Sequence, residues 1–217
     1  MLYIIGLGLN KDGISKYGLD TAKRCKKVYL ENYTIEFPYA LSELIEVIEK
    51  DIKTLNREEV ESLSLVDESK KKDVALLVYG SPLTATTHIT LLQECLASNV
   101  KCKVIYSASI IDAVAETGLQ LYKFGKTASM PEFEADSYLE NVKDNQKINA
   151  HSLILVDIGL NFKDALDKLE KDSKNKNLRL GKIVVCSNLG TKYQKIVYDH
   201  VEKLKDVTLD AALNHPT

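Results

Sequence analysis

One uninterrupted apolar run constrains the fold of this chain more than any other segment. Residues 73–79 read DVALLVY, and a strand without polar alternation is typical of a parallel sheet that is covered on both faces. Gly80-Ser81-Pro82 ends the run abruptly, because glycine and proline favour turns. A helix is predicted from about Thr87 to Ser98, and four of its apolar residues are expected on the buried side: Ile89, Leu92, Cys95 and Leu96.

The same alternation of strand, loop and helix continues along the chain and predicts an α/β fold with a mostly parallel sheet. Further strands are expected at residues 2–7, 28–30, 52–55, 103–106, 151–158 and 182–186. Helices are expected after Ser15, a good N-cap, and at residues 41–52, 110–117, 137–145, 162–172 and 193–204. We predict two α/β domains, residues 1–112 and residues 113–217, with a cleft between them.

Composition limits the kinds of partner and the cell compartment. The chain of 217 residues is 45% hydrophobic and has a formal net charge of −2, so no bulk positive field draws it to nucleic acid or to anionic lipid. It has no apolar run near the ~20 residues that span a bilayer, and its first residues lack the features of a signal peptide. The four cysteines form no CxxC pair. We therefore expect a cytoplasmic protein with reduced thiols and no bound metal.

Four strand-end segments rich in Gly, Ser or Thr are candidates for a ligand site. In open α/β sheets, ligands bind beyond the carboxyl ends of the strands. Glycine permits close approach of the backbone, and Ser and Thr supply short uncharged hydrogen-bonding groups. The sequence therefore predicts that a polar ligand is held where these loops converge. The loops are residues 6–9, 80–88, 107–110 and 187–190.

Common catalytic and phosphate-binding motifs do not fit these loops. Gly6-Leu7-Gly8 lacks the third glycine of a dinucleotide-binding fingerprint, and the sequence contains neither a P-loop nor a GxSxG elbow. His88 could act as a base in the cleft, but we interpret it as a structural residue that hydrogen-bonds the turn at the start of its helix. Asp73 is interpreted as a strand-end carboxylate, and Asp157 either ends a strand or faces the cleft.

Several segments of the chain resemble the diphthine synthases. They are MLYIIGLGL at residues 1–9, GLDTAKRCKKVYLENYT at 18–34, the stretch 73–88, SIIDAV at 109–114 and TGLQLYKFGK at 117–126. The resemblance is dense up to about residue 126, and thinner but still in register at 151–158 and 183–190. No single segment is specific for this family, but the whole set of segments in this order is.

The resemblance implies the tetrapyrrole-methylase-like fold, in which two α/β domains surround S-adenosylmethionine. The implied activity is methylation of the 3-amino-3-carboxypropyl-histidine of translation elongation factor 2 during diphthamide biosynthesis, by a homodimer. No catalytic side chain is implied, because methyl transfer from a sulfonium needs alignment more than acid–base help. Carried over by position, the cofactor contacts would be Leu9, Ser81, Thr84, Ser109, Ile110, Val156 and Leu189.

Two departures from the family pattern affect these expectations. Ser81 stands where the family usually has the aspartate of Gly-Asp-Pro, so any charged contact from that side chain is lost, which would weaken cofactor binding by roughly 1.5–3 kcal/mol. Relatives usually continue beyond the point where this sequence stops, Thr217, so we expect the second domain to lack its last strand and helix. Two alternatives stay open, namely a methylase of a corrin or porphyrin precursor and a degenerate, non-catalytic binding protein.

Overall fold

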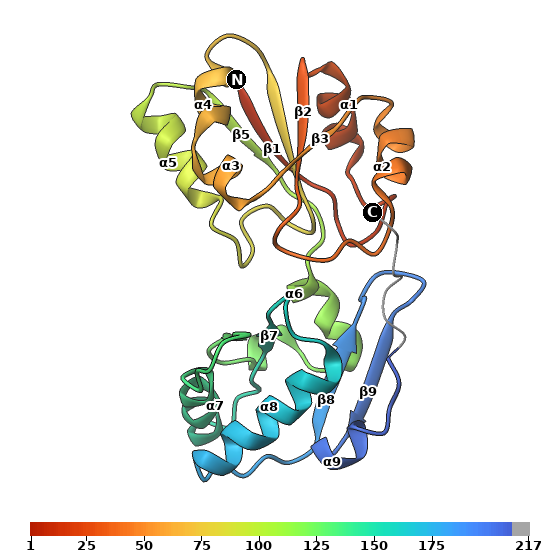
Figure 1. Cartoon of the computed structure of the whole chain (residues 1–217), viewed down its shortest axis with the longest axis vertical. Helices are drawn as coiled ribbons and strands as arrows, with labels where there is room; N and C mark the ends of the chain where they lie inside the picture. Colours follow the sequence, from red (N-terminus) through yellow and green to blue (C-terminus); the bar gives the residue numbers. More distant parts are fainter. Residues whose placement is uncertain (210–217) are drawn as a thin grey trace. The chain divides into compact units, whose positions relative to one another are not determined.

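The computed structural model describes residues 1–209, and the chain divides into two compact units between Ala113 and Val114 (Figure 1). Each unit combines strands with helices, in agreement with the predicted α/β class. The segment Asn214-His215-Pro216-Thr217, on which the expectation of a missing strand and helix was based, lies outside the described residues. The two units are therefore described one at a time.

The first unit is built on a five-stranded sheet in which every strand is parallel to its neighbours. Its strand order is β3-β2-β4-β1-β5. The strands are β1 (Leu2–Gly6), β2 (Lys27–Glu31), β3 (Lys53–Leu55), β4 (Val74–Val78) and β5 (Cys102–Ile105). Every residue of β4 is 0% exposed. This confirms that the uninterrupted apolar run is a parallel strand covered on both faces.

Helices cover both faces of this sheet (Figure 1). On one face lie α1 (Lys16–Arg24) and α2 (Leu41–Ile48), and on the other lie α3 (Arg57–Glu61), α4 (Ser64–Ser69) and α5 (Ile89–Ala97). Successive strand residues point to opposite faces, so Leu77 joins the core beside α1 and α2, whereas Leu76 joins the core beside α3 to α5. Because both faces are occupied, polar groups for a site must come from the ends of the strands.

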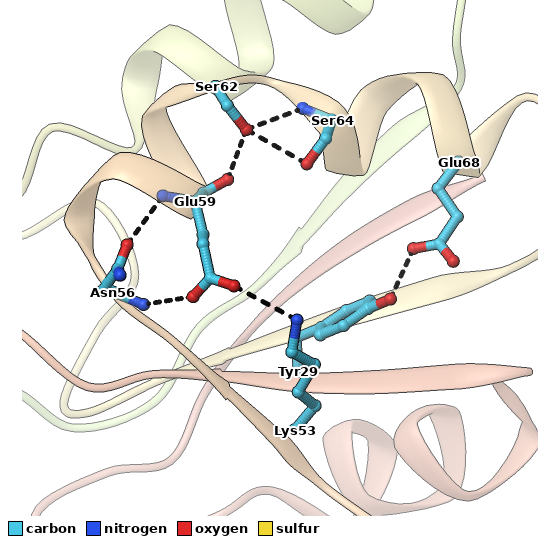
Figure 2. Close-up of polar contacts among 7 residues, drawn as sticks. All are labelled: Tyr29, Lys53, Asn56, Glu59, Ser62, Ser64 and Glu68. Carbon is cyan, nitrogen blue, oxygen red and sulfur yellow. Dashed lines mark hydrogen bonds and ion pairs between the residues drawn. The ribbon is translucent and has the colours of Figure 1, made fainter.

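Side-chain caps explain where two of these helices begin. Ser15 Oγ accepts a hydrogen bond from the Gly18 N–H at 3.0 Å, which confirms the predicted N-cap of α1. The stretch after β3, for which no helix was predicted, forms α3 because Asn56 and Glu59 cap each other. Each of these two side chains accepts a hydrogen bond from the backbone N–H of the other at 2.9 Å (Figure 2).

Polar contacts also tie α3 and α4 to strands β2 and β3 of the sheet (Figure 2). The Tyr29 hydroxyl of β2 donates to Glu68 Oε2 of α4 at 2.8 Å, and Lys53 Nζ of β3 lies 3.2 Å from Glu59 Oε1 of α3. These side chains line a surface hollow of about 350 Å³. Glu68 also pairs with Lys72 at 2.7 Å, so both carboxylates in the hollow have partners within the protein and serve to dock the helices.

The buried side of α5 differs in part from the predicted one. Leu91 and Cys95 are each 1% exposed, whereas Ile89 is 48% exposed and Leu96 is 83% exposed. The expectation for Cys95 is confirmed, and those for Ile89 and Leu96 are wrong. His88, just before the helix, is 1% exposed. It takes the inner position that the apolar pattern assigned to Ile89, which shifts the buried stripe by about one residue.

The second unit contains two small sheets around one core. The strands β6 (Ala128–Met130) and β7 (Ile154–Val156) are parallel, and β8 (Ile183–Ser187) and β9 (Lys195–Asp199) are antiparallel. The helices are α7 (Tyr138–Lys147), α8 (Phe162–Asn175) and α9 (Val201–Leu204), and 3₁₀ turns span Val114–Thr117 and Leu121–Lys123. Residues from both sheets and from the three α-helices share a hydrophobic core.

The helix predicted at residues 193–204 is wrong. Lys195–Asp199 forms β9, which pairs with β8 as a hairpin, and only Val201–Leu204 is α-helical. The chain reverses between the two strands through two residues with positive φ, Asn188 at 51° and Gly190 at 77°. The β9 segment KIVYD is rich in β-branched and aromatic residues, which favour strands. Its pairing with β8 decides between strand and helix where the local apolar pattern allowed either.

Helix α5 provides a matched test of this burial pattern. Replacing Leu91 by Ala should lower the free energy of unfolding by about 2–5 kcal/mol, because it opens a cavity in the core. Replacing Leu96 by Ala should change it by less than about 0.5 kcal/mol, because that side chain is already in solvent. Urea denaturation of both variants measures the difference. Equal losses would contradict the orientation of α5.

Candidate functional site

The carboxyl ends of β1, β4 and β5 meet at Gly6. These strands are neighbours in the sheet, so the loops that follow them leave from the same edge. A Cβ atom on Gly6 would lie 2.6 Å from the carbonyl oxygen of Gly80 and 3.0 Å from Cδ of Pro82. It would also lie 3.1 Å from Cβ of Ser107. Three of the four predicted loops are therefore in contact, and a glycine at position 6 makes that contact possible.

Backbone hydrogen bonds join the first two of these loops. The Gly8 N–H donates to the Gly80 carbonyl at 3.2 Å, and the Gly80 N–H donates to the Gly8 carbonyl at 2.9 Å. Both glycines have positive φ, 72° and 68°, a conformation that other residues rarely adopt. The Tyr79 hydroxyl donates to the carbonyl of Leu9 at 2.8 Å. The backbone at Leu9, a predicted contact residue, is thus held by the end of β4.

The turn that follows β4 is held by its own backbone and side chains. The Thr84 N–H donates to the Ser81 carbonyl at 3.1 Å. The Pro82 carbonyl oxygen lies 2.7 Å from Thr86 Oγ1 and 3.0 Å from His88 Nδ1, which confirms the structural interpretation of His88. The Ser81 and Thr84 side chains are half-buried, and neither hydroxyl bonds to another of residues 1–209. Both hydroxyls are therefore available to a ligand.

The third loop brings Ser109 beside Gly80, where α6 (Ile110–Ala113) begins. A Cβ atom on Gly80 would lie 4.0 Å from Cα of Ser109. Ser109 Oγ accepts from the Ile111 N–H at 3.0 Å, and its own N–H donates to Asp112 Oδ2 at 2.9 Å. Ser109 is only 5% exposed, whereas Ile110 is 39% exposed. This loop therefore presents the apolar side chain of Ile110, because the serine hydroxyl is used to start the helix.

The two remaining predicted contact residues, Val156 and Leu189, belong to the second unit. Val156 ends β7 and is 48% exposed, and Leu189 lies between β8 and β9 and is 7% exposed. The structure thus gathers five of the seven predicted residues at one edge of the first unit. Asp157 Oδ1 accepts a hydrogen bond from the Ile158 N–H at 2.8 Å, the contact expected of a carboxylate in a strand-end turn.

Comparison with known proteins decides the family. The sequence profile of the tetrapyrrole (corrin/porphyrin) methylases matches residues 1–205. The chain belongs to the tetrapyrrole methylase family. A crystal structure of diphthine synthase superposes on this family member with a TM-score of 0.89 and 31% sequence identity, covering 96% of this chain and 85% of that chain.

Curated relatives of this methylase-family chain are diphthine methyl ester synthases. The protein of Candida glabrata is 43% identical over 166 residues, which are 73% of this chain and 56% of the relative. The protein of Saccharomyces cerevisiae is 42% identical over 166 residues, which are 73% of this chain and 55% of the relative. The chain thus spans little more than half the length of these relatives. The similarities confirm the resemblance to diphthine synthases and favour neither alternative.

Sequence reasoning missed one buried acid at the same edge of the sheet. Glu31 ends β2 and is 0% exposed. Its Oε1 accepts a hydrogen bond from Thr34 Oγ1 at 2.5 Å. Burial raises the pKa of Glu31, and the Thr34 hydroxyl and His88 oppose that shift. The sequence does contain a signal for this residue: Glu31 is the last residue of the strand segment KVYLE. Open α/β sheets bind ligands beyond this end of their strands, so a carboxylate there is a candidate site residue.

The polar groups of this methylase-family chain suit binding and orientation. Residues 1–209 include no group of three or more His, Cys, Asp or Glu side chains placed to hold a metal ion. Burial raises the pKa of Cys102 to about 12 and that of Cys25 to about 11, so both thiols are protonated at neutral pH and react poorly as nucleophiles. Within the same residues, no helix has both the length and the apolar character needed to cross a bilayer.

The contact at Gly6 can be tested by adding one methyl group. Gly6→Ala should lower the free energy of unfolding by about 1–3 kcal/mol, because its Cβ overlaps the backbone of a neighbouring loop. Gly181→Ala is the matched control, because a Cβ there meets no atom within 4 Å, and it should leave stability unchanged or slightly raised. Urea denaturation compares the two. A Gly6→Ala protein as stable as the control would show that the loops do not depend on this glycine.

Proposed function

We propose that this chain is an S-adenosylmethionine-dependent methyltransferase that acts as a diphthine synthase. One observation carries the proposal: two diphthine methyl ester synthases are 43% and 42% identical to it over 73% of its length. The substrate would be the 3-amino-3-carboxypropyl-histidine of translation elongation factor 2, modified during diphthamide biosynthesis. The fold similarity to a diphthine synthase crystal structure, with a TM-score of 0.89, supports the same function.

The cofactor is proposed to contact the seven residues that match the family by position. S-adenosylmethionine has polar groups on its amino-acid, ribose and adenine parts, and such a ligand needs a few well-placed donors and acceptors within an apolar surround. The half-buried hydroxyls of Ser81 and Thr84 fit the polar part of that requirement, and the exposed side chain of Ile110 fits the apolar part. The proposed contacts are Leu9, Ser81, Thr84, Ser109, Ile110, Val156 and Leu189.

The proposed chemistry needs alignment more than a catalytic side chain. When bound, the cofactor supplies an electrophilic methyl group on a sulfonium. The acceptor amine must arrive unprotonated and in line with that methyl group, so a site that orients both partners and excludes water provides most of the rate enhancement. The paired backbone bonds of Gly8 and Gly80 make the loops a firm support for such alignment. The hydroxyls of Ser81 and Thr84 can orient a ligand and, at neutral pH, compete little with the amine for the methyl group.

We further propose that the chain works in the cytoplasm as a homodimer and binds neither membranes nor nucleic acid directly. The net charge of −2 and the four free cysteines support this setting. Large apolar side chains on the surface of the second unit, including Tyr122, Phe133 and Ile148, are at least 69% exposed. Such side chains are candidates for burial by a second copy.

Ser81 provides a test of cofactor binding. If the side chain at this position contacts the cofactor, Ser81→Asp should tighten S-adenosylmethionine binding by about tenfold or more, because a charged hydrogen bond is gained. Ser81→Asn is the matched control, since it has nearly the same shape without the charge. Calorimetric titration measures both dissociation constants. Equal affinities for the Asp and Asn variants would rule out a charged contact at position 81.

Substrate class is tested by methyl transfer itself. The chain should transfer label from methyl-labelled S-adenosylmethionine to elongation factor 2 that has the modified histidine. Replacing that histidine in the factor should abolish the label, since the acceptor amine is then missing. Scintillation counting of the purified factor gives the result. A folded chain that binds the cofactor yet labels neither form of the factor would contradict the proposed substrate.

A further inference from the structure

One glutamine side chain closes the turn between β8 and β9. Gln194 Oε1 accepts a hydrogen bond from the backbone N–H of Gly190 at 2.7 Å. The Nε2 of the same side chain donates to Glu116 Oε2 at 2.6 Å. Glu116 belongs to the 3₁₀ turn Val114–Thr117. This pair of hydrogen bonds, the Gln194 bridge, therefore joins two segments of the second unit that lie 78 residues apart in the chain.

The two partners of Gln194 determine how its amide group is oriented. A backbone N–H only donates and a carboxylate only accepts, so the side chain between them must supply one acceptor and one donor. The amide of Gln194 has both, and the reverse orientation would place its oxygen against the carboxylate. The bond to Glu116 is charge-assisted and thus stronger than a neutral one. Glu116 therefore holds the amide in the orientation that Gly190 needs.

The turn itself is held at both ends. Asn188 and Gly190 have positive φ, 51° and 77°, a region that is sterically costly for a residue with a side chain. The Thr191 N–H and Oγ1 both donate to the Asn188 carbonyl, at 3.1 Å and 2.8 Å. These two bonds fix the Asn188 end of the turn, and the Gln194 bridge fixes the Gly190 end. The residue between the two fixed ends is Leu189.

The Gln194 bridge acts directly on the carbonyl group of Leu189. This carbonyl and the Gly190 N–H belong to the same peptide unit, which is planar, so an acceptor that holds the N–H also sets the direction of the carbonyl. The carbonyl of Leu189 has no hydrogen bond to any other of residues 1–209. It is therefore an oriented acceptor that the protein does not use for its own folding.

We propose that Gln194, oriented by Glu116, is a positioning residue that fixes the peptide between Leu189 and Gly190 for ligand binding. A carbonyl oxygen only accepts hydrogen bonds, so the group that it receives is an amino or hydroxyl donor of the ligand. Fixing the peptide before the ligand arrives raises affinity, because less freedom is lost on binding. The identity of the ligand as S-adenosylmethionine, and the contact at Leu189, rest on the proposed function.

The hold on Gly190 can be measured without any ligand, by water-exchange NMR of its amide in the whole chain. Gln194→Ala removes the acceptor and should speed this exchange about tenfold or more. Gln194→Glu should also speed it, because two carboxylates then face each other. Adding Glu116→Gln to Gln194→Glu supplies a donor again and should restore slow exchange. The matched control is Gln146→Ala, whose amide donates to the Arg179 carbonyl at 3.2 Å and which should leave Gly190 unchanged.

The reciprocal pair of variants keeps this test decisive. Unchanged exchange of the Gly190 amide in folded Gln194→Ala would overturn the proposal. If Gln194→Ala does not fold, Gln194→Glu and its combination with Glu116→Gln decide. Fast exchange in the single variant and slow exchange in the double variant would support the bridge, and any other result from these two would overturn it.

The positioning role is measured by calorimetric titration with S-adenosylmethionine. Gln194→Ala and Gln194→Glu should each weaken binding about tenfold, and adding Glu116→Gln to the latter should restore most of the affinity. Gln146→Ala should bind as the native chain does. Urea denaturation separates positioning from general support of the fold. Because Glu116 is exposed and Gln194 is only half-buried, these variants should keep the native free energy of unfolding.

The outcomes separate this proposal from the proposed function. Native affinity in Gln194→Ala would overturn the positioning role, and so would a tenfold weaker affinity that comes with an equal loss of stability. An affinity that the double variant does not restore would also overturn it. If the native chain does not bind S-adenosylmethionine, the proposed function fails. The exchange of the Gly190 amide then still decides whether Gln194 fixes this peptide.

Discussion

The close approach of three loops at Gly6 is the constraint on which the candidate site depends. Because β4, β1 and β5 are adjacent and parallel, their carboxyl ends leave the sheet together. Helices cover both faces of the sheet, so the strand side chains are used for packing and the loops must provide the polar groups. With no side chain at Gly6, the Gly80 carbonyl and Pro82 can pack against the first strand. The two backbone hydrogen bonds between Gly8 and Gly80 then hold the start of the turn that follows β4.

Two sets of polar groups at this edge have different roles. The Ser81 and Thr84 hydroxyls are half-buried and have no partner among residues 1–209, so they can meet a ligand. His88 and Glu31 are buried: His88 Nδ1 bonds the Pro82 carbonyl of the turn, and Glu31, at the end of β2, accepts a hydrogen bond from the Thr34 hydroxyl. The proposed methyl transfer, which depends on alignment, would benefit from this division, because the buried bond of His88 supports the turn that presents the two free hydroxyls.

The sequence predicted those parts of the fold that depend on local pattern or on turn chemistry. The apolar run of β4 and the Ser15 cap belong to this kind, and both are confirmed. The wrong predictions concern segments whose structure is decided by a partner far away in the chain. Residues Lys195–Asp199 form a strand because β8 is available for pairing, and the buried stripe of α5 is displaced because His88 has polar partners in the core. Neither partner is visible in the local apolar pattern.

The sequence by itself determined the α/β class, the parallel strand at the centre of the first sheet, and the loops most suited to a ligand, because apolar runs and turn residues act over a few neighbours. It also provided the resemblance to diphthine synthases that the family comparison confirms. Only the tertiary structure decided that three of those loops touch at Gly6, that the Ser109 hydroxyl caps α6, and that Glu31 is buried at the end of β2. These facts depend on the strand order β4-β1-β5 and on burial, which arise from contacts between residues far apart in the chain.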